Sequence, residues 1–338
     1  MPSERRAIAH CDLEALGRFQ RLKILDDGVS GHNGVAGNLN EGVFVVKRLR
    51  DGKICVLKRI PATNDALINE IKILQDLYHP NICQYIDGFI SEDDPPPLRA
   101  SLYMEYCDLG NMESLLGKYR NHSQRPRARA YIPEAFLWKT FLELSSALQY
   151  LHHGIEAGGP FIPKDPPAWR RVLHRDIKPA NIFLKSSPYL TCPTVVLGDF
   201  GCATKYGIKD WNDITSIIGT RLWQPPELPQ HTARGDVWSL GAVIQALCRL
   251  DEGPVGSPPA GVDHHSWSIS PEARQPKRAG NHYSKELNHA LASALTMQKD
   301  ERPFAYKLYR DVKYFLQSAR RKWGLRDEPF PAWAFDRR

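Results

Sequence analysis

The sequence predicts an α+β fold in two parts, and three observations support this prediction. Strand-like runs separated by turn signals occupy residues 19–107, with one amphipathic helix among them. Residues 108–318 carry apolar side chains at helical spacing over several long segments. The chain has 338 residues and is 42% hydrophobic, so it can bury a sizeable core. We therefore expect a small, mainly antiparallel β part with one helix, followed by a larger, mainly helical part.

The two ends of the chain lie outside this pattern. Residues 1–18 form a leader with little pattern, and its first residues lack the apolar core of a signal peptide. Residues 319–338 form a C-terminal tail in which Trp323, Phe330, Trp333 and Phe335 stand among charged residues. We expect the aromatic side chains of this tail to be able to dock on the helical part.

Composition argues against several classes of protein. The net charge of +7, from 45 basic and 38 acidic residues, is spread along the chain. The basic clusters at Arg125–Arg129 and Arg320–Lys322 are expected to be solvated surface, because no motif that reads nucleic acid accompanies them. The seven cysteines form no Cys-x-x-Cys pair, which favours a reducing compartment, the cytoplasm or the nucleus. The chain has no run of 18 apolar residues, so no membrane span is expected.

Five strands are predicted in the first part. The Asp51-Gly52 pair is a good hairpin turn between the second and third of them. The predicted runs begin at Arg21 and then cover Val43–Val46, Ile54–Lys58, Ile82–Ile90 and Leu102–Tyr106. Lys58 shares a strand face with Ile54 and Val56, because side chains alternate along a strand. This position suits the wall of a cleft, although an exposed lysine at a strand end fits the run equally well.

A predicted helix decides between these two readings of Lys58. Asn64 can cap this helix, and Leu67, Ile71 and Leu74 form its apolar stripe. Glu70 lies at the edge of this buried stripe, where a carboxylate needs a cationic partner. We therefore expect Lys58 to pair with Glu70.

The second part is predicted to be helical. Its longest helix begins at Pro133 and Glu134, because proline fits the first turn and an early glutamate suits the helix dipole. This helix ends at His152-His153-Gly154, and we expect the two histidines to be surface or cap residues rather than metal ligands. Further helices are predicted at Asn111–Tyr119, from Asp236 through Leu247, at Ser284–Met297 and at Phe304–Ser318. Proline-rich or polar loops are predicted at Arg120–Arg129, at Gly158–Arg171, an insertion of unknown role, and at Gly253–Gly280.

Two polar segments carry the most specific pattern in the chain. The first reads HRDIKPANIF from His174 to Phe183, and the second reads LGDFG from Leu197 to Gly201. The first segment offers a carboxylate that can accept a proton, at Asp176, and a cation two residues later, at Lys178.

The same segments also offer two oxygen ligands. Asn181 and Asp199 carry hard oxygen atoms, which Mg²⁺ prefers. An apolar strand at Thr194–Leu197 is expected to bring Asp199 back to the same place as Asn181.

Together these segments resemble the catalytic loop and the metal-binding loop of protein kinases. With Met104–Cys107, which reads MEYC, they are most similar to the NIMA-related (NEK) kinases. The resemblance covers about residues 20–317 and implies the bilobal protein kinase fold. It also implies transfer of the γ-phosphate of ATP to a serine or threonine hydroxyl of a protein substrate, with Mg²⁺.

The resemblance implies a role for each motif residue. Asp176 would be the catalytic base, and Lys178 would approach the moving phosphate. Asn181 and Asp199 would hold Mg²⁺. Lys58, paired with Glu70, would hold the α- and β-phosphates of ATP. The full set implied for the ATP site is Val43, Val56, Lys58, Met104, Glu105, Cys107 and Phe183.

The resemblance extends to the end of the activation segment and beyond. Thr220 would hydrogen-bond near Asp176 and Lys178, which is the serine/threonine-specific pattern. Glu227 would pair with a buried arginine, Arg302, because each needs the other. Asp236 would anchor the backbone of the catalytic loop.

The resemblance also implies that phosphorylation regulates the activity. Ser216 is a candidate phosphorylation site, with Thr215 as second choice, and the modification would come from an activating kinase or from autophosphorylation. A phosphate there could be held by Arg175 and Lys205, which would order the segment.

One segment departs from the kinase pattern. Ala36, Asn38 and Glu41 stand where the glycines of the phosphate-covering loop are usual. Four glycines lie instead at 28, 31, 34 and 37. A pseudokinase that acts as a binding or scaffold module is therefore the alternative, and the complete catalytic set opposes it. The Thr220–Glu227 segment and the Asp236 helix argue against a third candidate, a small-molecule kinase.

Overall fold

The computed structural model divides into two compact units. The first unit comprises Met1–Tyr78 and Cys83–Tyr106, and the second comprises His79–Ile82 and Cys107–Arg338. The structure describes residues 17–26, 42–61, 65–91, 99–125, 130–159, 169–187, 192–206, 218–254, 256, 258–263, 266–267 and 270–335.

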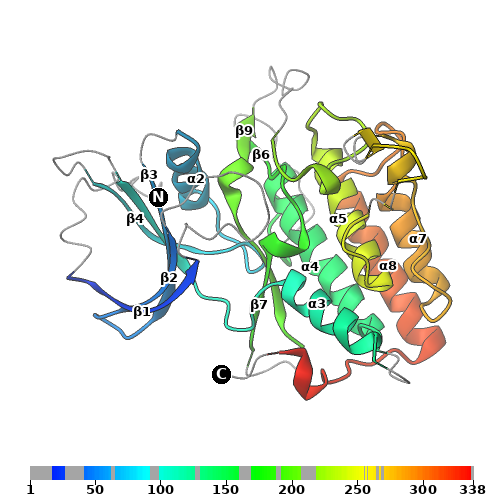
Figure 1. Cartoon of the computed structure of the whole chain (residues 1–338), viewed down its shortest axis with the longest axis horizontal. Coiled ribbons are helices and arrows are strands. Elements are labelled where there is room, and N and C mark those ends of the chain that lie inside the picture. The colour runs from blue at the N-terminus through cyan, green and yellow to red at the C-terminus, as the bar shows by residue number, and fades with distance from the viewer. Residues whose placement is uncertain are drawn as a thin grey trace. The chain divides into compact units, whose positions relative to one another are not determined.

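The first unit is a five-stranded antiparallel sheet with one helix (Figure 1). The strands are β1 (Phe19–Asp26), β2 (Gly42–Arg48), β3 (Ile54–Pro61), β4 (Tyr85–Ser91) and β5 (Arg99–Glu105). Their order in the sheet is β1-β2-β3-β5-β4, and every neighbouring pair is antiparallel. Helix α2 (Asp65–Gln75) packs against β4 and β5. This arrangement confirms the predicted α+β class.

The hairpin between β2 and β3 turns at the predicted Asp-Gly pair. Gly52 has a φ of 71°, in the region that favours glycine, and its N–H donates to the Arg48 carbonyl at 2.8 Å. The Asp51 carboxylate accepts a hydrogen bond from Arg48 Nε at 2.9 Å. The turn fixes the register in which Val43 faces Lys58.

One face of this sheet forms a small core. It contains stacked Phe19 and Tyr103 rings, with centroids 4.0 Å apart, and an edge-on Phe89 ring. Cys55 and Leu57 of β3 are also buried in this core. Because side chains alternate, Lys58 lies on the other face of β3, as predicted.

The second unit is mainly helical, as predicted (Figure 1). Its longer helices are α3 (Met112–Ser123), α4 (Glu134–His153), α5 (Ala233–Arg249), α7 (Lys285–Ala294) and α8 (Ala305–Trp323). Helix α4 packs against both α5 and α8. Two small sheets join strands of the same unit: β6 (Arg171–Leu173) with β9 (Thr204–Tyr206), and β7 (Ile182–Lys185) with β8 (Thr194–Leu197).

Local signals explain where the helices begin and end. Helix α4 ends at Gly154, whose φ of 65° is a left-handed C-cap. Helix α5 begins three residues before the predicted Asp236, because the Thr232 side chain accepts the Gly235 N–H and caps it. Helix α8 continues five residues past the predicted Ser318 and stops at Gly324, which also has a positive φ. Part of the predicted tail is therefore helical.

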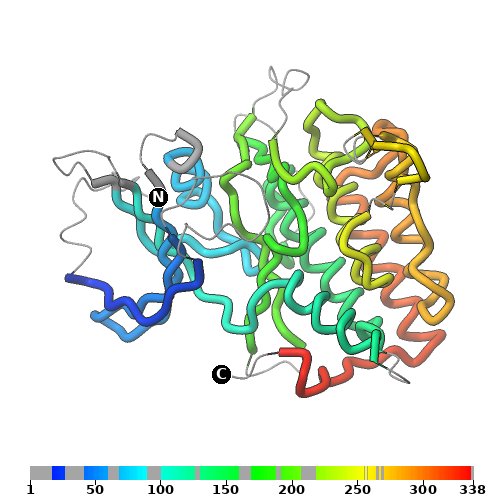
Figure 2. Tube along the Cα trace, viewed as in Figure 1, coloured from blue at the N-terminus to red at the C-terminus, as the bar shows by residue number. Residues whose placement is uncertain are grey.

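The rest of the tail packs on the second unit. Trp333 stacks on His122 of α3 with ring centroids 4.2 Å apart and contacts Tyr119 at 4.8 Å. Phe330 meets Phe136 of α4 edge-on at 4.8 Å. Figure 2 shows this segment, coloured red, beside α3. The tail thus covers aromatic side chains of two helices, as expected from its composition.

The two histidines at the end of α4 are not surface residues, so this part of the prediction was wrong. His152 has no exposed surface and His153 has 7%. His153 packs edge-on against Phe304 and Tyr306, at 5.9 and 5.0 Å between ring centroids. The sequence gives the reason: His152 lies four residues after Leu148, on the buried stripe of the helix.

Burial of His153 predicts that acid destabilises the second unit. The His153 pKa is lowered from 6.5 to about 3, and burial is the largest cause. The unfolded chain therefore takes up a proton below pH 6.5 that the folded chain refuses, so stability falls as pH decreases from 6.5 towards 3. We expect His153→Phe to gain about 2 kcal/mol at pH 5 relative to pH 8, since each pKa unit corresponds to about 1.4 kcal/mol. Urea unfolding at both pH values measures this. An equal difference between variant and native chain at pH 5 and pH 8 would contradict it.

In the described ranges, no helix combines the length and the apolar character needed to cross a membrane.

Candidate active site

In the first unit, β3 and α2 bring Lys58 and Glu70 together. Lys58 Nζ lies 3.0 Å from Glu70 Oε2. The Glu70 side chain is fully buried and the Lys58 side chain is 16% exposed. Because both charges lie largely out of solvent, removing either partner of the pair would be strongly unfavourable. The predicted contact is therefore present, and its role in binding phosphate stays a prediction.

In the second unit, Asp176 lies at the centre of a hydrogen-bonded group. It follows β6 in the chain and is 6% exposed. Asn181 Nδ2 donates to the Asp176 carbonyl at 2.9 Å and to its Oδ2 at 3.0 Å. Lys178 Nζ lies 3.1 Å from the same Oδ2. One loop thus supplies a carboxylate, a cation and an amide within hydrogen-bonding distance.

Thr220 joins this group from a distant part of the chain. Its backbone N–H donates to Asp176 Oδ1 at 2.7 Å. Its Oγ1 accepts a hydrogen bond from Lys178 Nζ at 2.6 Å. The structure therefore places Thr220 beside both predicted partners, and both carboxylate oxygens of Asp176 receive a donor.

Asp199 is held close to the same loop by backbone contacts. It follows β8, and the Gly198 N–H donates to the Asn181 carbonyl at 2.9 Å. The His174 Nε2 lies 3.0 Å from the Gly198 carbonyl, which can only accept, so this nitrogen carries the proton. The other ring nitrogen of His174 then accepts the Asp176 N–H at 3.3 Å. Asp199 itself has a left-handed φ of 58°.

Asp236 supports the catalytic-loop backbone from α5. Its Oδ2 accepts the His174 N–H at 2.9 Å, and its Oδ1 accepts the Arg175 N–H at 3.0 Å. Arg175 has a φ of 65°, a conformation that costs energy for a residue with a side chain. The carboxylate therefore holds a strained backbone in place.

His152 is a third partner of Asp236, and sequence reasoning did not find it. Its Nε2 lies 3.0 Å from Asp236 Oδ2, and both side chains are buried. Burial raises the pKa of Asp236, but the hydrogen bond and charge of His152 and the contacts of His174 outweigh it, so the net pKa is lowered. The four-residue spacing from Leu148 was the available signal for its burial.

Comparison with known proteins decides the family. A family model described as protein kinase domain matches residues 32–314. This chain belongs to the protein kinase family.

Several curated kinases are similar to it over most of its length. The probable serine/threonine-protein kinase nek2 of Dictyostelium discoideum is 31% identical over 286 residues, which are 80% of this chain and 59% of the relative. The human serine/threonine-protein kinase Nek2 is 30% identical over 271 residues, 76% of this chain and 53% of the relative. The G2-specific protein kinase nimA of Emericella nidulans is 31% identical over 315 residues, 86% of this chain and 40% of the relative. The resemblance to NIMA-related kinases is therefore confirmed, and the chain spans about half the length of these relatives.

The structure also contains the predicted pair of Glu227 and Arg302. Arg302 NH1 donates to Glu227 Oε1 at 2.7 Å, and NH2 donates to Oε2 at 3.0 Å. Arg302 is 1% exposed. This two-point geometry is the strongest form of an arginine–carboxylate pair.

The residues implied for the adenine site belong to different units. Val43 and Val56 lie on β2 and β3, and Met104 and Glu105 end β5, all in the first unit. The Glu105 N–H is already bonded to the Gln84 carbonyl at 3.0 Å. Cys107 and Phe183, the latter on β7, belong to the second unit. Their contribution to ATP binding stays a prediction.

Several predictions lie outside the described residues. They concern the candidate phosphorylation sites Thr215 and Ser216, the glycines at 28, 31, 34 and 37, the helix cap Asn64 and most of the 158–171 insertion. Of the two expected phosphate partners, Lys205 lies on β9. The other, Arg175, donates from Nε to the Cys202 carbonyl at 2.7 Å.

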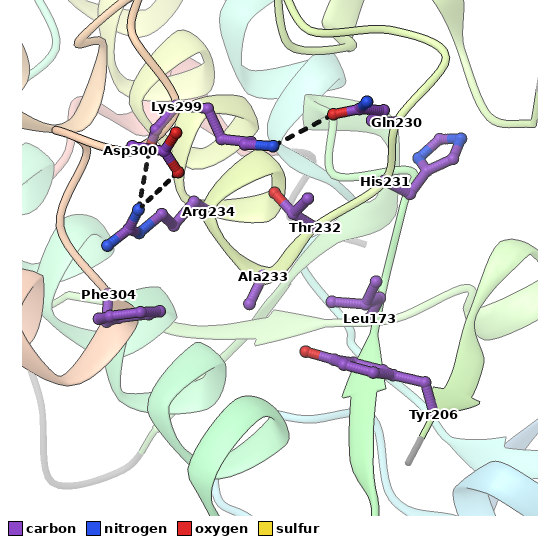
Figure 3. A pocket seen from close by; sticks show the side chains of 10 residues that line it. All are labelled: Leu173, Tyr206, Gln230, His231, Thr232, Ala233, Arg234, Lys299, Asp300 and Phe304. Carbon is purple, nitrogen blue, oxygen red and sulfur yellow. Dashed lines mark hydrogen bonds and ion pairs between the residues drawn. The ribbon is translucent and has the colours of Figure 1, made fainter. Parts of the chain in front are cut away.

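A pocket of about 260 Å³ lies in the second unit, between β6, β9, the start of α5 and the loop before α8. Figure 3 shows Lys299 pointing towards Gln230, at 3.1 Å, and Arg234 towards Asp300, at 3.3 Å. Phe304 lies under the Arg234 guanidinium at 4.2 Å. Lys299 and Arg234 are therefore both held by other residues that line the pocket. Asp176, Lys178, Asn181 and Asp199 are not among the described lining residues.

Proposed function

We propose that this chain is an active serine/threonine protein kinase that transfers the γ-phosphate of ATP to a protein hydroxyl. The observation that carries the proposal is the Asp176 carboxylate, bound by Asn181, Lys178 and Thr220 at 2.7–3.1 Å. Phosphoryl transfer depends almost entirely on positioning and electrostatic stabilisation. A carboxylate whose two oxygens are held by neighbours is positioned before substrate binds.

Asp176 would accept the proton of the substrate hydroxyl as it attacks the phosphate. Lys178 would stabilise the negative charge of the transferred group, because its ammonium lies beside the same carboxylate. The Lys178–Thr220 contact is typical of the serine/threonine class, and the similar proteins carry that description in their names.

The residues present fit Mg²⁺. Both hydrogen bonds from Asn181 use Nδ2, so its Oδ1 is the atom that can serve a cation. Asp199 adds a carboxylate from the neighbouring segment. The described residues contain no group of three or more His, Cys, Asp or Glu that could hold a metal, so the ion would be shared with the phosphates of ATP, as is usual for Mg²⁺. Bound there, Mg²⁺ would neutralise charge on the phosphates.

Lys58 would hold the α- and β-phosphates of ATP, with Glu70 fixing its ammonium. None of the six cysteines that the structure describes is in a disulfide, which supports a reducing compartment, the cytoplasm or the nucleus. Protein substrates with a serine or threonine acceptor are the expected partners. The activator would be another kinase or a second copy of this chain acting by autophosphorylation.

The experiment that tests the proposal is transfer of radiolabelled γ-phosphate from Mg-ATP to casein and to myelin basic protein. We expect the native chain to label serine and threonine. Asp176→Asn should lower the rate at least a hundredfold, since a positioned general base contributes about 10²–10⁴. A native chain that transfers nothing, even after treatment with an activating kinase, would favour the pseudokinase reading. Nucleotide binding would then show whether a ligand is still held.

A further inference from the structure

Gln224 is buried in the second unit, within the segment Thr220–Glu227, and its side chain contacts the catalytic loop. It is 3% exposed, and no motif of the sequence pointed to it. Its Nε2 donates to the Arg175 carbonyl at 2.6 Å and to the Ile218 carbonyl at 3.2 Å. The first carbonyl directly precedes Asp176, and the second lies two residues before Thr220. One amide group therefore joins the two stretches of backbone that bring Thr220 against Asp176.

The contact is close enough to require glycine beside it. Gly219 has a φ of 87°, and a Cβ built there would lie 2.3 Å from Gln224 Nε2 and 2.4 Å from the Arg175 carbonyl. Arg175 also has a positive φ, of 65°. Gly219 adopts its positive φ easily, but that of Arg175 costs energy and persists only when the surroundings hold it.

Arg274 holds Gln224 from the other side. This arginine lies on the short helix η5 (Glu272–Arg274) and is 2% exposed. Its Nε donates to the Gln224 carbonyl at 2.9 Å, and its NH2 donates to the Arg221 carbonyl at 2.9 Å. Its NH1 donates to the Ser270 carbonyl at 3.1 Å. Burial, followed by the charge of Arg221, lowers the Arg274 pKa to about 10, which still leaves it charged at neutral pH.

We propose that Gln224 is a positioning residue: its side-chain amide holds Thr220 against Asp176, and Arg274 fixes Gln224 in turn. This inference rests on the proposed phosphoryl transfer. Gln224 touches the reacting groups only through backbone carbonyls. Losing the amide should therefore affect the alignment of Asp176, and hence kcat, more than the binding of ATP or protein substrate.

The first test is Gln224→Met, which keeps the length of the side chain and removes its hydrogen-bond donors. We expect kcat to fall at least tenfold, while KM for ATP stays within twofold. The matched control is Gln245→Met. Gln245 is also buried in the second unit, and its Oε1 accepts the Lys277 N–H at 2.6 Å, away from the catalytic loop. This control should lose stability but keep kcat within twofold.

The second test is the pH profile of Gln224→Glu. At pH 8 the introduced carboxylate would face two carbonyl oxygens without a donor, so kcat should fall further than in Gln224→Met. A protonated carboxyl has one O–H donor, and burial raises a carboxyl pKa. We expect kcat relative to the native chain to rise at least threefold from pH 8 to pH 6. Simple loss of packing would give no such recovery.

Hydrogen exchange of the native and variant chains separates this inference from the proposed function. Amides of residues 218–223 should exchange faster in Gln224→Met than in the native chain or in Gln245→Met. This result is expected whether or not the chain transfers phosphate. A native chain without activity would overturn the proposed function, and the exchange would still test whether Gln224 holds Thr220 against Asp176. Unchanged exchange, or an active native chain whose kcat survives Gln224→Met, overturns the inference.

Discussion

Replacing Asp236 with asparagine should lower kcat at least a hundredfold and the free energy of unfolding by about 3 kcal/mol. The carboxylate accepts two backbone N–H groups, of His174 and Arg175, and lies 3.0 Å from the buried His152. The asparagine amide would turn a donor towards one of these donors and leave a buried group without a partner, which costs about 1–3 kcal/mol. A displacement of about 1 Å in the catalytic loop can itself cost a hundredfold in rate.

Urea unfolding and steady-state kinetics measure the two effects. The matched control is Asp300→Asn, because the Asp300 side chain is 89% exposed and its 3.3 Å contact with Arg234 is a surface pair. Such pairs contribute about 0–1 kcal/mol, so this control should keep both stability and kcat. The native pKa of Asp236 is lowered, so its contribution is present above pH 3.8 and is lost in stronger acid. An Asp236→Asn chain with native kcat would show that the catalytic loop holds its shape without this carboxylate.

Local periodicity was enough to predict the fold class and one buried ion pair. Strand alternation placed Lys58 on one face of β3, and helical spacing placed Glu70 at the edge of the α2 stripe. Each inference used only residues close together in the sequence, and the two partners are only 12 residues apart. Such a short-range pattern predicts the folded structure well, because burial of the apolar side chains selects the strand register in which they face the core.

The contacts between distant segments could not be predicted from patterns. His152 and Asp236 are separated by 84 residues, and Gln224 and Arg175 by 49. Nothing in the spacing of either pair identifies the partner, since the packing of α4 against α5 brings the first pair together. The roles of Asp236 and Thr220 came from the kinase resemblance, and no motif covers Gln224 or Arg274. The same limit applied to Trp333, whose partners on α3 lie more than 200 residues earlier.

Replacing Arg302 with methionine should destabilise the second unit by about 3–5 kcal/mol, the usual cost of removing one partner of a buried ion pair. Arg302 donates to both oxygens of Glu227 and also to the carbonyls of Arg234 and Thr296, at 2.8 and 2.9 Å. Methionine fills much of the same volume but leaves the Glu227 carboxylate, 12% exposed, without a cation. The control Arg320→Met removes an exposed arginine, 53% exposed and 3.7 Å from Asp327, and should cost less than about 1 kcal/mol.

The double variant Glu227→Leu with Arg302→Met distinguishes a stranded charge from lost packing. Removing both charges leaves no unpaired carboxylate, so the double variant should be more stable than Arg302→Met alone, although Arg234 and Thr296 lose a donor. Equal or lower stability of the double variant would mean that the guanidinium acts mainly through the backbone carbonyls. Urea unfolding of the native chain, Glu227→Leu, Arg302→Met and the double variant completes the double-mutant cycle. Because Glu227 lies only three residues beyond Gln224, kcat in the same chains would show whether this pair also supports the end of the activation segment.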